Sequence, residues 1–242
     1  MGTGNIFLGC SGWAYPTWKP DFYPPKLSPK KLLEFYASRL NSVEVNYTFR
    51  SLPTETTINS WLAATNDGFR FSFKAPQRIT HILRLKNCSE SLQRFANSIG
   101  PVATAGRLGV VLFQLPPNMK ADATVLKSFL EEARHINFRP TFEFRNVTWF
   151  SEPIYAVLRE HDAALCIAES DELSTPPEMT ASFSCYRLRR ADYSAAHLAA
   201  IRDNLKAQAA RGDVFAYFKH EDDPTGALQA ASLLEELSRN EG

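Results

Sequence analysis

The sequence predicts a (β/α)8 barrel of the TIM type that spans residues 1–242 as a single domain. Short strand-like runs alternate with helix-like segments from end to end, which is the pattern of parallel βαβ units. Eight such runs in roughly 250 residues are what this barrel requires. No change in composition marks a linker between two domains. An open doubly wound sheet is the alternative.

The expected strands are short apolar runs bounded by polar or turn-forming residues. They cover residues 6–11, 42–46, 69–75, 108–114, 140–145, 163–169, 183–188 and 213–219.

Amphipathic segments between these runs predict the helices. The clearest signals lie at 29–40, 54–65, 122–134, 194–210 and 224–239. Ser28-Pro29 and Asp223-Pro224 each place an N-cap residue before a first-turn proline. The sixth unit is degenerate, because Glu169 to Thr180 contains Pro176-Pro177 and has no apolar period. We expect a loop or a single turn there.

The turn after the first strand weighs against the open sheet. It reads Gly9-Cys10-Ser11-Gly12-Trp13-Ala14, a poor match to the G-x-G-x-x-G pattern of dinucleotide-binding sheets. The phosphate-binding pattern G-x-x-x-x-G-K-[ST] does not occur either. The sequence therefore contains no nucleotide-cofactor motif, and the cofactor is unknown.

Composition indicates a folded chain without a strongly charged partner surface. Hydrophobic residues make up 44% and charged residues 22%, and the formal net charge is +1, so affinity for polyanions has to come from a local patch. No apolar stretch approaches the roughly 20 residues of a membrane helix. The four cysteines form no C-x-x-C pair, and we expect them to be buried thiols. These features predict a soluble, cytoplasmic protein without a membrane partner.

Polar residues alternate with apolar ones in several expected strands. Phe142 and Phe144 share one face and Glu143 and Arg145 the other. In a barrel the apolar set packs on the helices and the polar set faces the lumen, here at the C-terminal strand ends where barrel enzymes build their sites. The expected rim residues are Ser11, Glu44, Asn46, Lys74, Gln114, Glu143, Arg145, Glu169, Arg187 and Lys219.

This rim is better explained by a ligand pocket than by a stabilising ion lattice, because burying ions gains little stability. The excess of basic residues favours an anionic or oxygen-rich ligand. His81 and His220 add groups that titrate near neutrality. Glu44, Glu143, Glu169 and the two histidines are potential metal ligands, but the histidines are too few to predict a metal site. A metal is not excluded.

The loop at residues 11–25 contains five aromatic residues and is longer than usual. Two readings are open: a rigid lid or stacking platform over the ligand, and a hydrophobic cluster that seals the barrel mouth. The two are compatible if only Trp13 or Tyr15 faces the ligand.

Several motifs together resemble the YecE-like family, known as domain of unknown function 72. They are Gly12-Trp13-Ala14-Tyr15 with Phe22-Tyr23-Pro24, Val43-Glu44-Val45-Asn46, Phe71-Ser72-Phe73-Lys74-Ala75-Pro76 with Thr80-His81, Leu112-Phe113-Gln114-Leu115-Pro116-Pro117, and Glu143-Phe144-Arg145 with Trp149-Phe150. The resemblance implies a (β/α)8 barrel and no established activity.

The sequence departs from the pattern of that family in two places. Arg187-Leu188-Arg189-Arg190 stands where the family pattern has Arg-Leu-His-Gly, and Phe218-Lys219-His220-Glu221 stands where it often has Phe-Asn-Asn. Both departures make the seventh and eighth loops more charged.

These residues predict an enzyme that uses acid–base chemistry on a small anionic or oxygen-rich molecule, as a hydrolase or an isomerase or lyase. Glu143 or Glu44 would exchange a proton, and Arg145, Arg187 or Lys219 would stabilise an anion. The catalytic candidates are Glu143, Arg145, Glu44 and Lys74. The substrate-binding candidates are Trp13, Tyr15, Ser11, Asn46, His81, Gln114, Glu169, Arg187, Lys219 and His220.

Other functions stay open. A glycosidase needs two carboxylates about 5 to 10 Å apart, but the fourth and seventh strands end in Gln114 and Arg187. A barrel that binds nucleic acid or cleaves its phosphodiester bonds would use the aromatic loop and Arg187, Arg189 and Arg190 as a groove. A non-catalytic ligand-binding barrel would bind without turnover.

Overall fold

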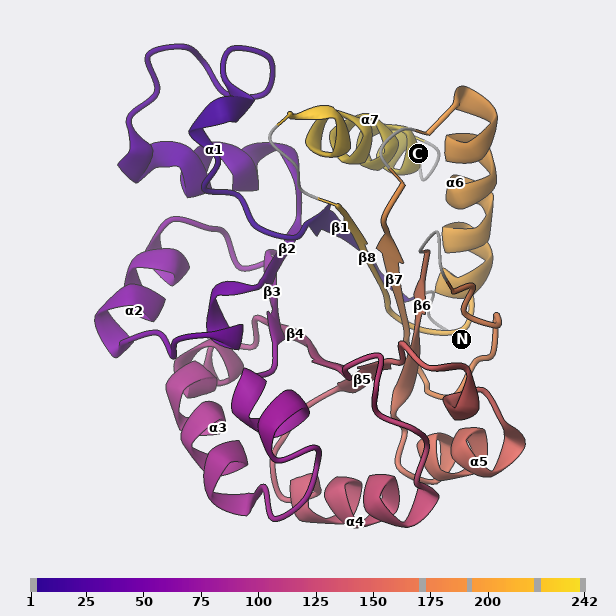
Figure 1. Cartoon of the computed structure of the whole chain (residues 1–242). Coiled ribbons are helices and arrows are strands. Elements are labelled where there is room, and N and C mark those ends of the chain that lie inside the picture. The colour runs from indigo at the N-terminus through magenta and orange to yellow at the C-terminus, as the bar shows by residue number, and fades with distance from the viewer. Residues whose placement is uncertain (1–3, 170–172, 191–192, 220–222, 240–242) are drawn as a thin grey trace.

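The computed structural model describes residues 4–169, 173–190, 193–219 and 223–239. Eight parallel strands form a closed barrel in sequence order, from β1 to β8, with the helices outside it (Figure 1). The predicted (β/α)8 fold is confirmed. The strands are β1 Ile6–Cys10, β2 Ser42–Val45, β3 Arg70–Lys74, β4 Leu108–Gln114, β5 Pro140–Glu143, β6 Ala164–Ala168, β7 Ser184–Leu188 and β8 Val214–Phe218.

Seven α-helices surround the barrel in the described part of the chain. They are α1 Leu32–Arg39, α2 Glu55–Ala63, α3 Ser89–Thr104, α4 Ala123–Ala133, α5 Glu152–Glu160, α6 Ala195–Ala209 and α7 Thr225–Arg239. α3, which contains Pro101, and α5, which has a proline in its first turn, lie outside the segments with the clearest sequence signals. No helix of the described residues is long and apolar enough to cross a membrane.

The connection between β6 and β7 has no helix in residues 173–183, as the Pro176-Pro177 segment predicted. Thr180 ties this connection to the barrel instead. Its hydroxyl donates to the carbonyl oxygen of Ala163 over 2.7 Å and accepts from the backbone N–H of Leu165 over 2.8 Å. The Thr180 side chain therefore anchors this connection to the start of β6.

Two helix starts were predicted from a cap residue followed by proline, and a helical segment begins at both, but the capping side-chain hydrogen bond forms at only one of them. The Ser28 side chain makes no capping hydrogen bond, and Pro29–Lys31 forms a 3-10 turn before α1 begins at Leu32. Asp223 does accept a hydrogen bond from the backbone N–H of Thr225 over 2.9 Å, where α7 begins.

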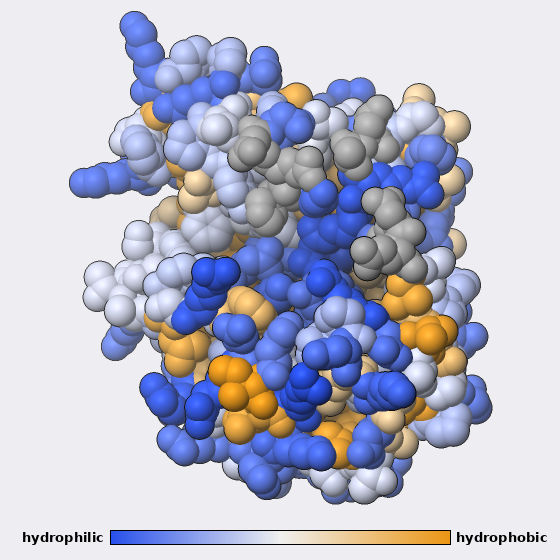
Figure 2. All heavy atoms as spheres, viewed as in Figure 1, coloured by the Kyte–Doolittle hydropathy of each residue, from blue (hydrophilic) through white to orange (hydrophobic). Residues whose placement is uncertain are grey.

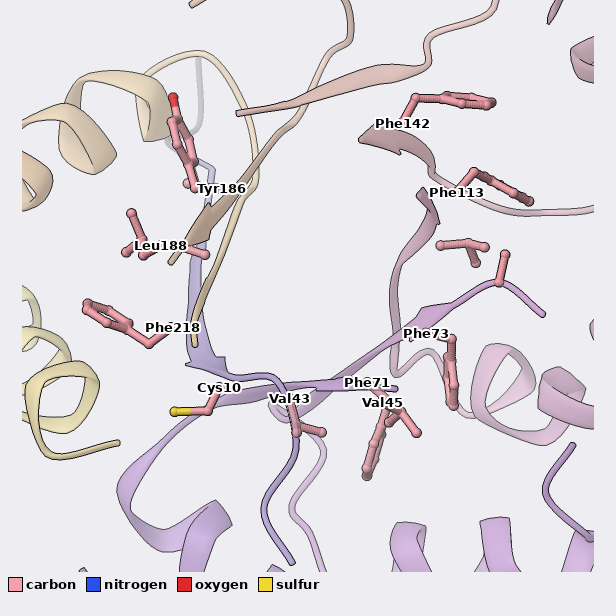
Figure 3. Packing of buried hydrophobic residues seen from close by; sticks show 14 of the residues in the cluster. Cys10, Val43, Val45, Phe71, Phe73, Phe113, Phe142, Tyr186, Leu188 and Phe218 are labelled. Atoms are coloured by element: carbon pink, nitrogen blue, oxygen red, sulfur yellow. The ribbon is translucent and has the colours of Figure 1, made fainter. Parts of the chain in front are cut away.

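The main hydrophobic core lies between the strands and the helices. Outward-facing residues of the strands, among them Val43, Phe73 and Phe142, point away from the barrel axis (Figure 3). Phe113 packs against Phe129 of α4 with ring centroids 5.0 Å apart. Alternate residues of the same strands are consequently left to fill the lumen.

The lumen is filled in layers. Phe7 and Phe215 stack at its lower end with ring centroids 4.9 Å apart. Cys166 and Cys185 are buried above them, opposite each other in the register of β6 and β7. All four cysteines of the chain are buried free thiols, so the expectation for them is confirmed.

A chain of hydroxyl groups crosses the lumen in the next layer. The Tyr217 hydroxyl lies 2.8 Å from Ser42 Oγ and 2.6 Å from Ser72 Oγ. Ser42 Oγ donates a hydrogen bond to the carbonyl oxygen of Arg70 over 2.9 Å, and Ser72 Oγ accepts one from the N–H of Val110 over 2.8 Å. Since each hydroxyl has one proton, Ser72 donates to Tyr217 and Tyr217 donates to Ser42.

The aromatic loop after β1 is mainly a packed cluster. Trp18, Phe22 and Tyr23 are buried, and Trp18 lies 5.5 Å from Phe22 and 5.8 Å from Tyr23 between ring centroids. The Tyr23 hydroxyl donates to the carbonyl oxygen of Trp13 over 2.5 Å. The reading of this loop as a hydrophobic cluster therefore describes most of it.

Candidate functional site

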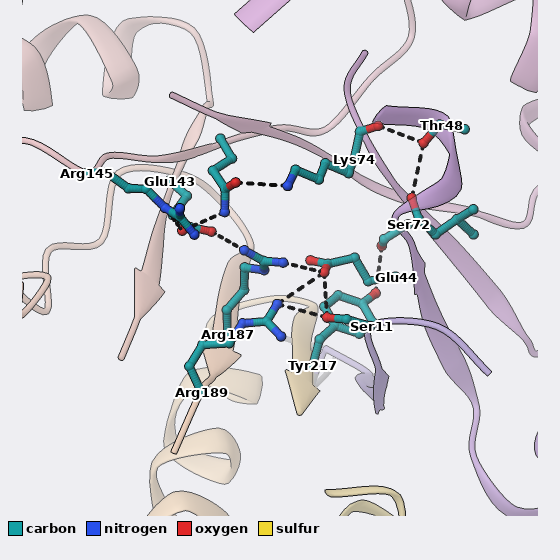
Figure 4. A network of polar contacts seen from close by, with 12 residues as sticks. Ser11, Glu44, Thr48, Ser72, Lys74, Glu143, Arg145, Arg187, Arg189 and Tyr217 are labelled. Carbon is teal, nitrogen blue, oxygen red and sulfur yellow. Dashed lines mark hydrogen bonds and ion pairs between the residues drawn. The ribbon is translucent and has the colours of Figure 1, made fainter. Parts of the chain in front are cut away.

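A network of charged side chains lies at the C-terminal end of the barrel, above the hydroxyl chain (Figure 4). Arg187 of β7 is at its centre. Arg187 donates through Nη2 to Glu44 Oε1 of β2 over 2.7 Å and through Nη1 to Glu143 Oε2 of β5. The Arg187 side chain is only 5% exposed. One guanidinium thus joins two carboxylates from separate strands inside the lumen.

Glu44 has two further partners. Ser11 Oγ donates to Glu44 Oε1 over 2.6 Å, and Arg189 Nη2 approaches the same oxygen at 3.2 Å. Arg189 also donates to Ser11 Oγ over 2.8 Å, and its side chain is 16% exposed. Arg189 therefore forms the side of the network next to the end of β1.

Glu143 is held from the opposite side. Gln114 Nε2 donates to Glu143 Oε1 over 2.8 Å, and Arg145 Nε donates to the same oxygen over 3.0 Å. Arg145 is half exposed, so its remaining guanidinium nitrogens face the mouth. The bond to Glu143 also fixes the amide of Gln114, because its other end then presents the Oε1 acceptor.

Lys74 at the end of β3 contacts only neutral groups in the network. Its Nζ donates to Gln114 Oε1 over 2.8 Å and lies 4.3 Å from the centroid of the Phe49 ring. Both nearby carboxylates bind arginines instead. Within the residues that the structure describes, Lys74 has no acidic ion-pair partner.

The electrostatics of the two carboxylates follow from these contacts. Burial alone raises the pKa of Glu44, but the charges of Arg187 and Arg189 and hydrogen bonds from Arg187 and Ser11 outweigh it and lower the pKa to about 2. Burial likewise raises the pKa of Glu143, but the charges of Arg187 and Arg145 and the hydrogen bonds from Gln114 and Arg187 outweigh it and lower this pKa to about 2. Both carboxylates are ionised at neutral pH.

The pKa of Lys74 is also lowered, which for a basic group favours the neutral form. Burial and then the charge of Arg187 lower the pKa of Lys74 to about 8, although Glu44 and Glu143 act to raise it. Four basic side chains, Lys74, Arg145, Arg187 and Arg189, face two carboxylates here. Hydrophilic residues gather over the centre of the barrel in Figure 2. The mouth therefore carries an excess of positive charge.

The structure brings together seven of the predicted site residues and separates others from them. Ser11, Glu44, Lys74, Gln114, Glu143, Arg145 and Arg187 form the network described above. His220 lies outside the described residues.

Glu169 and Lys219 lie towards the seventh and eighth loops. Glu169 accepts a hydrogen bond from the Tyr193 hydroxyl, and its Oε1 lies 3.8 Å from Arg190 Nε. Lys219 lines a small pocket with Arg190 and Gly226. These two residues border the network from the side of β6 and β8.

The remaining candidates lie around the edge. Trp13 packs edge-on against Trp61 at 5.3 Å, and the Tyr15 hydroxyl donates to the carbonyl oxygen of Ser11 over 3.2 Å. His81 packs edge-on against Phe49 at 5.1 Å, on the ring that Lys74 also contacts. Asn46 Oδ1 is buried without a hydrogen-bond partner among the described residues.

Phe49 and Tyr217 were missing from the sequence-based site, and Arg189 was named only for the nucleic-acid groove. Arg189 and Tyr217 have the same parity as Arg187 and Lys219 along their strands, so the alternation already placed them on the lumen side. Phe49 lies in the turn Tyr47–Phe49 after β2, where no periodicity applies.

Metal-ligating side chains are not clustered in the described part of the chain. No group of three or more His, Cys, Asp or Glu residues there is arranged to hold a metal ion. Glu44 and Glu143, the most buried of the acidic candidates, are bound by arginines instead.

The fold and this network define a (β/α)8 barrel protein with a polar, positively charged site at the C-terminal mouth. The chain belongs to the family described as Protein of unknown function DUF72, whose model matches residues 7–242. It is similar to the UPF0759 protein YunF of Bacillus subtilis, with 30% identity over 156 residues, 62% of this chain and 54% of YunF. It is also similar to the UPF0759 protein YecE of Escherichia coli K12, with 34% identity over 46% of this chain and 38% of YecE.

The matches thus span about half or less of the curated relatives. A crystal structure of a DUF72 family protein from Thermotoga maritima has a TM-score of 0.85 at 23% identity and covers 97% of this chain and 99% of its own. A D-psicose 3-epimerase from Clostridium cellulolyticum has a TM-score of 0.56 at 9% identity and covers 96% and 98%. At these identities the likeness shows the barrel fold.

Proposed function

We propose that this protein is an enzyme that moves a proton on a small anionic substrate bound at the barrel mouth. The observation that carries this proposal is the position of Lys74, a partly buried amine that has only neutral partners among the described residues and lies beside a network with excess positive charge. A basic group whose pKa lies near the working pH suits general acid–base catalysis.

The residues would divide the work as follows. Arg145, the half-exposed arginine of the network, would bind the anionic group of the substrate. Lys74 would exchange the proton. Glu44 and Glu143 would hold Arg187 and the surrounding donors in place, since carboxyls with a pKa of about 2 are weak bases and have no proton to give at neutral pH.

The nucleic-acid alternative is less well supported by the geometry. Of the three arginines expected to line a groove, Arg187 is buried and Arg189 turns inward to Glu44. The aromatic loop buries Trp18, Phe22 and Tyr23 in a cluster, which removes them as stacking surfaces. A long polyanion would find few of the expected contacts at the surface.

Hydrogen–deuterium exchange offers a test that needs no knowledge of the natural reaction. The protein is incubated in D2O with a panel of sugar phosphates and 2-oxo acids, and the loss of C–H signals next to the carbonyl group is followed by proton NMR. We expect exchange on at least one anion. Lys74→Met should slow it by about 100-fold or more, and Lys120→Met, a change at an exposed lysine after β4, should leave it intact.

Two outcomes count against the proposal. Saturable binding of these anions by calorimetry without exchange would indicate a ligand-binding barrel. Absence of both binding and exchange across the panel would contradict the proposal that the substrate is a small anion.

A further inference from the structure

The geometry points to a covalent role for Lys74: its amine forms a Schiff base with the carbonyl carbon of an anionic aldehyde or ketone. This inference rests on the proposed function and narrows its substrate class to carbonyl compounds that carry a carboxylate or phosphate. It is distinct from simple proton transfer, because it adds a bond between Lys74 Nζ and the substrate.

The contacts of Lys74 are compatible with a neutral amine. An amine keeps two N–H protons, so it can still donate to Gln114 Oε1, and the hydrogen bond of 2.8 Å survives the loss of charge. The amide cannot turn over easily, because Gln114 Nε2 is bound to Glu143. The lone pair of the amine is then directed away from Gln114 and is available for attack.

The surroundings also disfavour the ammonium form. Lys74 is partly buried, Arg187 and Arg145 add positive charge nearby, and both carboxylates are engaged by arginines. A lysine that is desolvated or placed beside another cation is the kind that forms Schiff bases. Exposed lysines such as Lys31 and Lys127 have carboxylate partners instead, Glu34 and Glu160.

The charged part of the substrate follows from the arginines. Arg145 and Gln114 both bind Glu143 Oε1, and Gln114 also binds Lys74. An anion bound at Arg145 therefore lies on the Lys74 side of the mouth. Arg189 offers a second cation next to Ser11. A carbonyl compound with an anionic group therefore satisfies both the arginines and the amine.

The chemical step balances without an oxidant or a reductant. The Nζ lone pair forms a bond to the carbonyl carbon, the π electrons move to oxygen, and a proton moves from nitrogen to that oxygen. The resulting hydroxyl then takes a proton from solvent and leaves as water, while the nitrogen lone pair forms the C=N bond of the protonated imine. The protonated imine withdraws electrons from the adjacent C–H bond, which makes the proton transfer of the proposed function easier.

His81 is placed to assist the proton movements of this step. Its ring packs against Phe49, the ring that Lys74 also contacts, and its Nδ1 lies 2.9 Å from Thr80 Oγ1. Burial and the charges of Lys74 and Arg145 lower the pKa of His81. The lowered pKa favours the neutral imidazole, which can accept a proton.

Reductive trapping tests the inference directly. The wild-type protein is treated with glyoxylate, a small anionic aldehyde, and sodium cyanoborohydride near neutral pH, and the carboxymethylated lysines are located by peptide mass spectrometry over time. A lysine with a lowered pKa has a larger neutral fraction near neutral pH, and its weaker basicity offsets part of this gain. We expect Lys74 to be labelled roughly tenfold faster than the exposed lysines.

Controls separate the roles of amine and anion. Lys74→Arg should lose the fast label and Lys120→Arg should keep it. Acetate, as a competing carboxylate, should slow the labelling of Lys74, and the neutral aldehyde propanal should label it more slowly than glyoxylate does. The wild-type map requires no variant, so the result holds even if Lys74→Arg fails to fold.

The outcomes distinguish this inference from the proposed function. Even labelling of all lysines by glyoxylate, together with exchange in D2O that depends on Lys74, would overturn the Schiff base and leave proton transfer in place. Labelling of Lys74 by propanal as fast as by glyoxylate, without competition by acetate, would overturn the anionic substrate class. That second result would also contradict the anion site of the proposed function.

Discussion

Arg187 Nη2 donates to Glu44 Oε1 over 2.7 Å across the lumen, although two strands separate β7 from β2 around the barrel. The same guanidinium binds Glu143 on β5. One buried cation therefore connects three strands that are not neighbours, and two carboxylates depend on it for their charge balance. This arrangement makes the network important for stability as well as for the proposed chemistry.

Removal of the central cation should destabilise the fold. Arg187→Met leaves Glu44 and Glu143 buried with fewer partners, and breaking a buried ion pair in this way costs about 3 to 5 kcal/mol. The triple variant Arg187→Met, Glu44→Gln, Glu143→Gln should recover part of the loss, because no carboxylate charge remains. Urea denaturation measures the free energy of unfolding. Equal stability of the single and triple variants would contradict the assigned pairing.

Acid should weaken the fold through the same carboxylates. The pKa values of Glu44 and Glu143 are about 2 in the folded protein, against 4.5 for an unperturbed glutamate, so the unfolded chain binds more protons over this range. Their contribution to stability is present above pH 4.5 and is lost as the pH falls towards 2. The free energy of unfolding, measured against pH, should fall less steeply in the triple variant than in the wild type.

Lys74 should cost stability at neutral pH. Its pKa is about 8 in the folded protein, below the usual 10.5, so the charged form is less favourable in the fold than in the unfolded chain. Lys74→Met should raise the free energy of unfolding by about 1 kcal/mol at pH 7, a value reduced for partial solvent screening and the lost hydrogen bond. The gain should vanish as the pH approaches 10.5, above which both states are neutral. A loss of stability of Lys74→Met at pH 7 would contradict the inference that the charged form of Lys74 is unfavourable in the folded protein.

The hydroxyl chain should contribute to stability and leave the mouth unchanged. Tyr217→Phe removes the acceptor of Ser72 and the donor to Ser42, and unsatisfied buried polar groups cost about 1 to 3 kcal/mol. Thermal and urea denaturation should show the loss. Glyoxylate labelling of Lys74 should proceed at the wild-type rate, because Tyr217 makes no hydrogen bond to Lys74 or Gln114 among the contacts of the described residues.

The sequence carried much of the information about the fold. Eight apolar runs and their alternation placed Glu44, Lys74, Gln114, Glu143 and Arg187 at the strand ends on the lumen side, where the structure has them. This works because side chains alternate along a strand, so parity decides the face. The absence of a helix over residues 173–183 also followed from local chemistry, through the two adjacent prolines.

Pairing within the site was not available from the sequence. The alternation does not say which carboxylate Arg187 binds, because that depends on the stagger of strands around a closed barrel. It also placed Glu169 and Lys219 with the others, whereas Glu169 lies beyond the end of β6 and binds Tyr193. Phe49 could not be found at all, since it approaches Lys74 through a turn rather than a strand.

The direction of the Val110–Ser72–Tyr217–Ser42–Arg70 chain has one more consequence. Each group in it donates its hydrogen bond to the next oxygen, and Ser42 donates the last one to the backbone carbonyl of Arg70. No hydroxyl proton of this chain is free to form a hydrogen bond with the charged groups above it. A substitution at the mouth that leaves these five groups in place is therefore expected to leave the direction of the chain unchanged.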